Sequence, residues 1–94
     1  MQTALTASDA DALIERYIQP DPDGFGLDRA RVVVGDAAVP VWALVGHLRG
    51  SSQRQTASDY ALPAEAVVAA IAYYRRHQAV IDARLTLNDA FFEP

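Results

Sequence analysis

The chain has 94 residues, of which 51% are hydrophobic and 21% charged. This length and composition predict one globular domain with a single core. It contains no cysteine, which excludes a disulfide framework and a thiolate metal site. Its apolar runs are far shorter than a membrane span, and residues 1–11 are too polar and acidic for a secretory signal. We therefore expect a cytoplasmic protein without a membrane role.

The net charge of −4 is unevenly distributed along the chain. Residues 1–28 hold six acidic residues and one arginine, residues 29–78 hold six arginines and three acidic residues, and residues 79–94 are acidic again. A basic middle predicts contact with phosphate, and acidic ends predict contact with something cationic. The alternative is a chance distribution of solvated charges in a short chain.

A first helix is predicted from Ser8 to Ile18. Ser8 and Asp11 have the spacing of a capping box, and apolar residues recur at helical spacing from Leu13 onward. Two prolines and a glycine in residues 19–24 end this helix. The aspartates of that segment lack the further oxygen ligands and the closing glutamate of a calcium loop, so no metal is expected there.

Two short strands are predicted next, at residues 31–34 and 38–41, with a turn between them. Pro40 confines the second strand to a sheet edge or to its own last residue. Two strands alone are only marginally stable, so they need a helix beneath them or a second copy of the protein beside them. The predicted dimer contacts are Val32, Val34, Val39 and Trp42, with core packing as the alternative for Trp42.

The middle of the chain predicts a helix, a break, a short helix, a tight turn and a long helix. Residues 41–48 carry an apolar face at the spacing i, i+3, i+4, i+7, and Gly50 follows as a stop. Ser52 and Gln55 form a capping box that opens a short helix to about Tyr60. This order is the outline of a helix-turn-helix domain.

The longest helical pattern runs from Leu62 to Leu85, and we expect the fold to be organised around it. Its apolar stripe consists of Val67, Ile71, Tyr74, Ile81 and Leu85. Pro63 suits the first helical position, because its N–H is not needed there. The basic cluster at residues 75–77 either ends a first helix or forms a collar within a longer one.

Several segments together resemble a family of small bacterial proteins. These segments are Val39-Pro40-Val41-Trp42, Asp59-Tyr60, Leu62-Pro63-Ala64-Glu65, residues 70–74 and Ile81-Asp82-Ala83. Their order and spacing, over about residues 32–88, resemble the helix-turn-helix proteins of domain of unknown function 433, many of which are described as antitoxins. The resemblance implies a homeodomain-like three-helix core after a short β-hairpin, a homodimer, binding and silencing of a nuclease-like toxin, and binding of operator DNA.

The sequence departs from that family at three places. Residues 36–38 stand where many members carry Gly-Thr-Arg, so an arginine suited to contact phosphate or a dimer partner is absent. Pro63 stands where the family often has a Ser or Thr N-cap. Gln78 stands where the family often has a proline that breaks the long helix, so a continuous helix is favoured here.

The predicted phosphate contacts lie around the break after the first of the three helices, with two arginines further along the chain. They are Arg49, Ser51, Ser52, Gln53, Arg54, Gln55, Arg75 and Arg76. In a helix-turn-helix domain the last of the three helices contacts the bases, and it is called the reading helix. Its expected start, residues 64–69, has no Arg, Lys, Asn or Gln to pair with base edges. Any DNA binding is therefore expected to use the backbone and to depend strongly on salt, and the alternative is that these groups are solvated surface residues.

The acidic, aromatic end of the chain is predicted to contact a toxin. The predicted partner-binding residues are Leu85, Leu87, Phe91, Phe92 and Glu93, and the alternative for the two phenylalanines is that they fold back on the core. His47 and His77 lack the partners of a catalytic triad or a zinc site, and no glycine-rich phosphate loop is present. We therefore expect neither an enzyme nor a bound cofactor, with His47 as a half-buried packing residue.

The sequence as a whole predicts a mainly α-helical protein with a homeodomain-like three-helix core, a short N-terminal β-hairpin and flanking helices. Residues 1–28 are expected to form an acidic helix and loop, residues 29–89 the hairpin and helix-turn-helix domain, and residues 90–94 a tail. The predicted function is that of an antitoxin-like protein that neutralises a cognate toxin and binds operator DNA. The alternatives are a stand-alone DNA-binding regulator and a dimerisation module without DNA binding.

Overall fold

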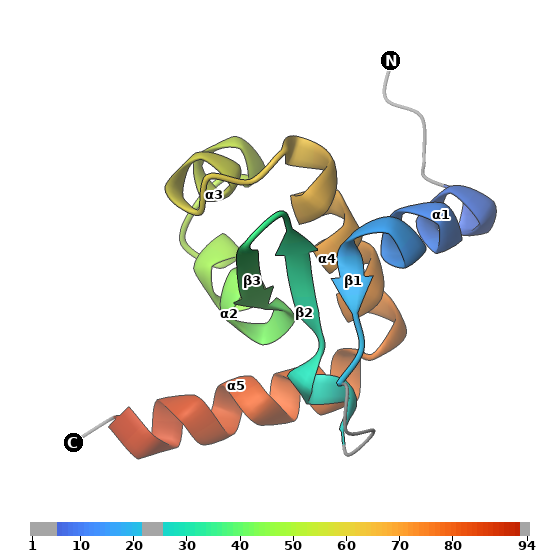
Figure 1. Cartoon of the computed structure of the whole chain (residues 1–94). Coiled ribbons are helices and arrows are strands. Elements are labelled where there is room, and N and C mark those ends of the chain that lie inside the picture. Colours follow the sequence, from blue (N-terminus) through green and yellow to red (C-terminus); the bar gives the residue numbers. More distant parts are fainter. Residues whose placement is uncertain (1–5, 22–25, 93–94) are drawn as a thin grey trace.

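Helix α4 (Ala64–Arg76) lies at the centre of the computed structural model, which describes residues 6–21 and 26–92. Within these residues the chain is mainly helical, with a small three-stranded antiparallel sheet (Figure 1). The other elements are α1 (Ala7–Tyr17), β1 (Ile18–Gln19), η1 (Leu27–Arg29), β2 (Arg31–Val34), β3 (Ala37–Pro40), α2 (Val41–Leu48), α3 (Gln53–Asp59) and α5 (Gln78–Phe92).

Three sides of α4 are covered by other elements: α1, the sheet, and the pair α2 and α3. Small side chains make this possible, because Ala66, Ala69 and Ala70 are each fully buried. The apolar stripe is therefore rotated from the predicted one. Ile71 and Tyr74 are only half-buried, whereas the alanines and Tyr73 face the core.

The N-cap of helix α1 is Thr6, two residues before the expected Ser8. The Thr6 hydroxyl accepts a hydrogen bond from the Asp9 N–H at 3.0 Å. The helix runs antiparallel to α4: Tyr17 at its end reaches Glu65, and Asp11 near its start pairs with Arg76. Residues 7–19 therefore share one folded unit with the segment from α2 to α4.

The sheet has a third strand that the sequence pattern did not indicate. Strand β1 is only two residues long and pairs with β2, which lies between β1 and β3. The register places Ile18, Val32 and Val39 directly opposite one another, so their side chains share one face. That face lies on the core, where Val32 is fully buried.

This register shows where the four predicted dimer residues lie within their own chain. Val32 is a core residue, and Val34, Val39 and Trp42 pack against the core of their own chain. The Trp42 ring also lies 5.0 Å from the guanidinium of Arg84, in a cation–π contact. The hairpin is thus stabilised by the third strand and the helices beneath it, which removes the reason for placing a second copy on these residues.

The segment from α2 to α4 follows the predicted order. Helix α2 has the predicted bounds, and Ser52 caps α3 by accepting a hydrogen bond from the Gln55 N–H at 3.0 Å. The turn into α4 uses Ala61 in a left-handed conformation, with φ of 54°. Pro63 lies at the N-cap of α4, one position before the predicted one.

The prediction of a continuous helix past Gln78 was wrong. The helix breaks at His77, whose φ and ψ are −130° and 36°, and α5 leaves in a new direction (Figure 1). The new direction lets Ile81 and Leu85 bury against α2, where Gly46 allows a close approach: a Cβ there would lie 3.1 Å from Leu85 Cδ2. Helix α5 then continues to Phe92, inside the segment expected to be a tail.

Two leucines on α5 provide a matched test of this arrangement. Leu85 is 4% exposed and Leu87 is 66% exposed. We expect Leu85→Ala to lower the free energy of unfolding by about 2–5 kcal/mol, through lost burial and a residual cavity. Leu87→Ala should change it by less than about 0.5 kcal/mol in dilute solution. Urea unfolding followed by circular dichroism checks both, and equal losses would contradict the packing described here.

Candidate functional site

An open groove of about 480 Å³ lies between the end of α2, the loop before α3, and α4. Its apolar floor is formed by Val45 and Leu48 of α2 together with Ile71 and Tyr74 of α4. Residues 71 and 74 are one helical turn apart, so they line the same side of α4. The side of α4 that faces the groove is thus separate from the sides that carry α1 and the sheet.

Polar and cationic groups form the rim of this groove. Arg49 and Arg75 contribute the charges, and Ser51, Ser52 and Gln53 contribute the polar groups. Arg49 lies 3.6 Å from an Asp82 oxygen, whereas Arg75 has no carboxylate partner among residues 6–21 and 26–92. The rim is therefore cationic, with Arg75 as its unpaired charge in the described part of the chain.

The first turn of α5 forms part of the surroundings of the groove. The Tyr74 hydroxyl donates a hydrogen bond to Asp82 Oδ1 at 2.7 Å. This bond to a carboxylate raises the pKa of Tyr74 above its ordinary value, with a smaller contribution from burial. Asp82 thereby contacts both Tyr74 on the floor of the groove and Arg49 on its rim.

The structure brings together five of the eight predicted phosphate contacts in this groove: Arg49, Ser51, Ser52, Gln53 and Arg75. Arg54 and Gln55 are exposed on α3 and do not line it. Arg76 lies elsewhere, because its guanidinium pairs with Asp11 and donates to the Ala7 carbonyl oxygen at 3.2 Å. Arg76 thus fastens α1 to α4, and this position does not support the predicted phosphate contact.

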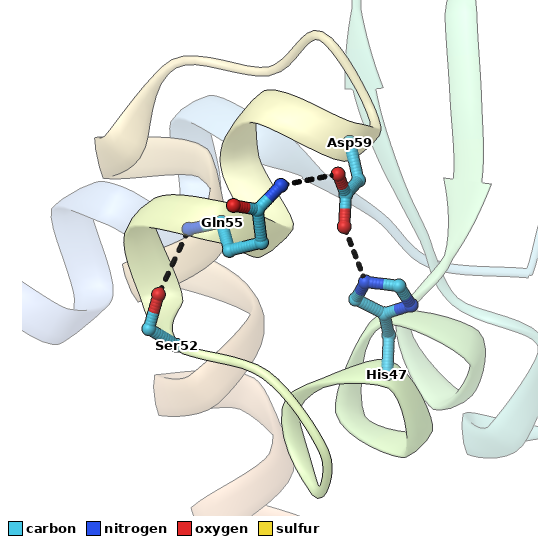
Figure 2. Close-up of polar contacts among 4 residues, drawn as sticks. All are labelled: His47, Ser52, Gln55 and Asp59. Carbon is cyan, nitrogen blue, oxygen red and sulfur yellow. Dashed lines mark hydrogen bonds and ion pairs between the residues drawn. The ribbon is translucent and has the colours of Figure 1, made fainter.

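A chain of polar contacts links α2 to α3 beside the groove (Figure 2). His47 Nε2 lies 2.8 Å from Asp59 Oδ2, and Gln55 Nε2 donates to Asp59 Oδ1 at 2.6 Å. The His47 ring also meets the Tyr60 ring edge-on, at 5.3 Å between centroids. His47 is half-buried as predicted, but its partner Asp59 was missed because twelve residues separate the two in the sequence.

This polar chain is structural in its geometry. The Ser52 hydroxyl is engaged by the Gln55 N–H and points to that amide, while His47 points to Asp59 (Figure 2). A nucleophile would need its hydroxyl against the histidine, and Ser52 does not have this arrangement. The contacts hold the two helices that form one wall of the groove.

The start of α4, which is the expected reading helix, is occupied by α1. Glu65 accepts a hydrogen bond from the Tyr17 hydroxyl at 3.1 Å and lies 3.8 Å from Arg16. The acidic helix α1 then follows α4 to Arg76. In this arrangement, α1 covers that side of α4.

The predicted partner-binding residues divide into two groups. Leu85 is part of the core, so its side chain is not available at the surface, whereas Leu87 is exposed. The side chains of Phe91 and Phe92, and all of Glu93, lie outside the described part of the chain. Asp89, next to this group, is exposed on α5.

Among the described residues, no cluster of three or more His, Cys, Asp or Glu side chains is placed to hold a metal ion. Within the same ranges, no helix combines the length and apolar character needed to cross a bilayer.

The Asp59 contacts predict a specific pH dependence. Hydrogen bonds from Gln55 and then His47 lower the pKa of Asp59 below its ordinary value of 3.8. A carboxyl with a lowered folded-state pKa stabilises the fold above the unfolded value, and this contribution is lost as the pH falls through the folded value. Asp59→Asn should therefore have a lower free energy of unfolding than the parent at about pH 5. This difference in free energy should decrease as the pH falls below 3.8.

Urea unfolding of parent and variant across this pH range measures the effect, and a difference that stays constant with pH would contradict it. The Gln55→Ala variant is the matched control. It should raise the Asp59 pKa toward its ordinary value, as followed by NMR of the carboxyl group, because Gln55 is the largest cause of the lowering.

Comparison with known proteins found no relative of this chain: no family model, curated protein or solved structure matches it. The resemblance to domain of unknown function 433 therefore stays a prediction from the residues quoted above. What the structure itself provides is a cationic groove with an apolar floor, a polar chain that holds its walls, and an exposed end of α5.

Proposed function

We propose that this chain is an antitoxin-like helix-turn-helix protein that binds and neutralises a partner protein through the exposed end of α5. Helices α2, α3 and α4 would form its homeodomain-like core. The order of these helices, the short α3 and the tight turn at Ala61 support this assignment. The proposal assigns the chain a binding role rather than a catalytic one.

The observation that carries the proposal is the position of Leu87. It is 66% exposed on a helix whose previous apolar residue, Leu85, is buried. The C-terminal part of α5 extends past the other elements (Figure 1). A large apolar side chain presented in this way is suited to a hydrophobic contact in a protein interface.

The charge around Leu87 indicates the chemistry of the partner. After Arg84 the sequence has two acidic residues, Asp89 and Glu93, and no cationic one. A nuclease-like toxin binds phosphates, so its substrate site is rich in cations. An acidic helix that also carries an apolar anchor can occupy such a site and exclude the nucleic acid.

The test is co-purification of the chain with the product of its adjacent gene, using a variant of the exposed end. Leu87→Arg with Asp89→Arg should weaken the complex at least tenfold, because it removes the apolar anchor and reverses the charge. Binding is measured by titration calorimetry. The matched control is Ala12→Arg with Glu15→Arg, which makes the same charge change at exposed positions of α1.

The control variant should bind like the parent, and both variants should keep the parent's circular dichroism. The absence of any complex between the parent chain and the neighbouring gene product would count against the proposal. Equal weakening by the two variants would show that net charge, and not the end of α5, drives the association.

A second candidate function is binding to the DNA backbone. The specific observation that favours it is the gathering of Arg49, Arg75, two serines and Gln53 at one groove, since cations and hydroxyl or amide donors are the usual contacts to phosphate. The expected reading helix offers no side chains suited to base edges, so binding should depend weakly on sequence.

Backbone binding predicts a measurable salt effect. Arg49→Ala with Arg75→Ala should weaken binding to duplex DNA and lower the slope of log K against log salt by about 2. Salt-titrated fluorescence anisotropy provides the measurement. Arg16→Ala is the control, because this arginine is exposed on α1 away from the groove and should leave the slope unchanged.

A further inference from the structure

The groove and the exposed end of α5 are two surfaces of the same chain that complement each other. The groove presents an apolar floor and the cations Arg49 and Arg75. The end of α5 presents the apolar Leu87 and the anionic Asp89. A ligand that fits the groove should combine an apolar group with a negative charge, and the end of α5 has this composition.

Three residues of α5 after Leu85 also lack packing against the rest of the described structure. Leu85 is buried, and after it residues 86, 87 and 89 are exposed and residue 88 is half-buried. A short helical segment without tertiary packing is only marginally stable in water. The exposed residues 86, 87 and 89 therefore leave a surface of α5 that another molecule can cover.

The position of Asp82 shows how a second copy would reach the groove. Asp82, in the early part of α5, contacts Arg49 at the rim and Tyr74 on the floor. In an antiparallel pair of α5 helices, the end of one helix lies beside the early part of the other. That position is next to the groove of the partner copy.

We propose that the part of α5 formed by residues 86–89 docks into the groove of a second copy, and that the two copies exchange these segments reciprocally. Both surfaces occur on each chain, so the exchange closes into a two-fold symmetric dimer with no unsatisfied end. Leu87 packs over the apolar floor, and Asp89 lies toward the cationic rim. This surface replaces the hairpin valines, which are used in the core.

The dimer has a consequence for the proposed function. The same segment of α5 is offered to the groove of a second copy and to a partner protein, so the two associations compete. The dimer itself does not rest on the partner-protein proposal. Its test uses this chain alone, so the two proposals can fail separately.

The absence of cysteine from the sequence makes disulfide trapping a clean test. Chains carrying Leu87→Cys are mixed with chains carrying Ser51→Cys and oxidised, and the products are resolved by mass spectrometry. The mixed disulfide should exceed by at least tenfold the mixed product of Leu87→Cys with Ala12→Cys. Ala12 is the control because it is exposed on α1, outside the groove.

Light scattering of the full chain at rising concentration supplies the second readout. The parent should approach twice the monomer mass, and Arg75→Glu should remain monomeric at concentrations where the parent dimerises. Arg54→Glu makes the same charge change at an exposed position that does not line the groove, so it should dimerise like the parent.

Three results would overturn the proposal. One is a parent chain that stays monomeric at every concentration. Another is a Leu87→Cys chain that crosslinks mainly to itself, because this would place the two α5 ends against each other and not in the grooves. The third is a dimer that Arg75→Glu and Arg54→Glu leave equally intact.

Discussion

The structure depends on the close packing of three sides of α4 by other elements. Alanines at positions 66, 69 and 70 are fully buried, and their small side chains allow neighbouring backbones to approach. Two polar contacts fix α1 at the two ends of α4, through Glu65 and Arg76. With α1 and the sheet on two sides, the remaining side meets α2 and α3, and the groove forms there.

The break at His77 allows α5 to pack against α2 with its first half while residues further along α5 are exposed. Because α5 turns away from α4, Ile81 and Leu85 bury against α2, while Leu87 and Asp89 are exposed. The Tyr73 hydroxyl donates to the Leu27 carbonyl oxygen at 3.1 Å, and Arg84 pairs with Asp28 at 3.2 Å. These contacts fasten η1 to α4 and α5, so the first part of α5 is held firmly and its end is left exposed.

The groove and the polar chain beside it show how local capping and tertiary contacts combine. Ser52 caps α3, and this fixes the loop that forms the groove rim. The Asp59 carboxylate then forms hydrogen bonds with Gln55 of its own helix and with His47 of α2. A local contact four residues apart and a distant one twelve residues apart thus meet at one carboxylate, which sets the relative placement of the groove's walls.

The sequence alone determined the elements whose signals are local. The bounds of α2, the Ser52 cap and the hairpin strand β2 follow from periodicity and spacing, because these features depend on neighbouring residues. Tertiary structure decided the rest. The two-residue strand β1, the break at His77 and the inward face of Val32 depend on partners distant in the sequence, and burial of Ile81 and Leu85 outweighed the continuity of the helical pattern. Contacts between distant parts of the chain also decide that five of the predicted phosphate contacts line one groove, whereas Arg76 pairs with Asp11 of α1.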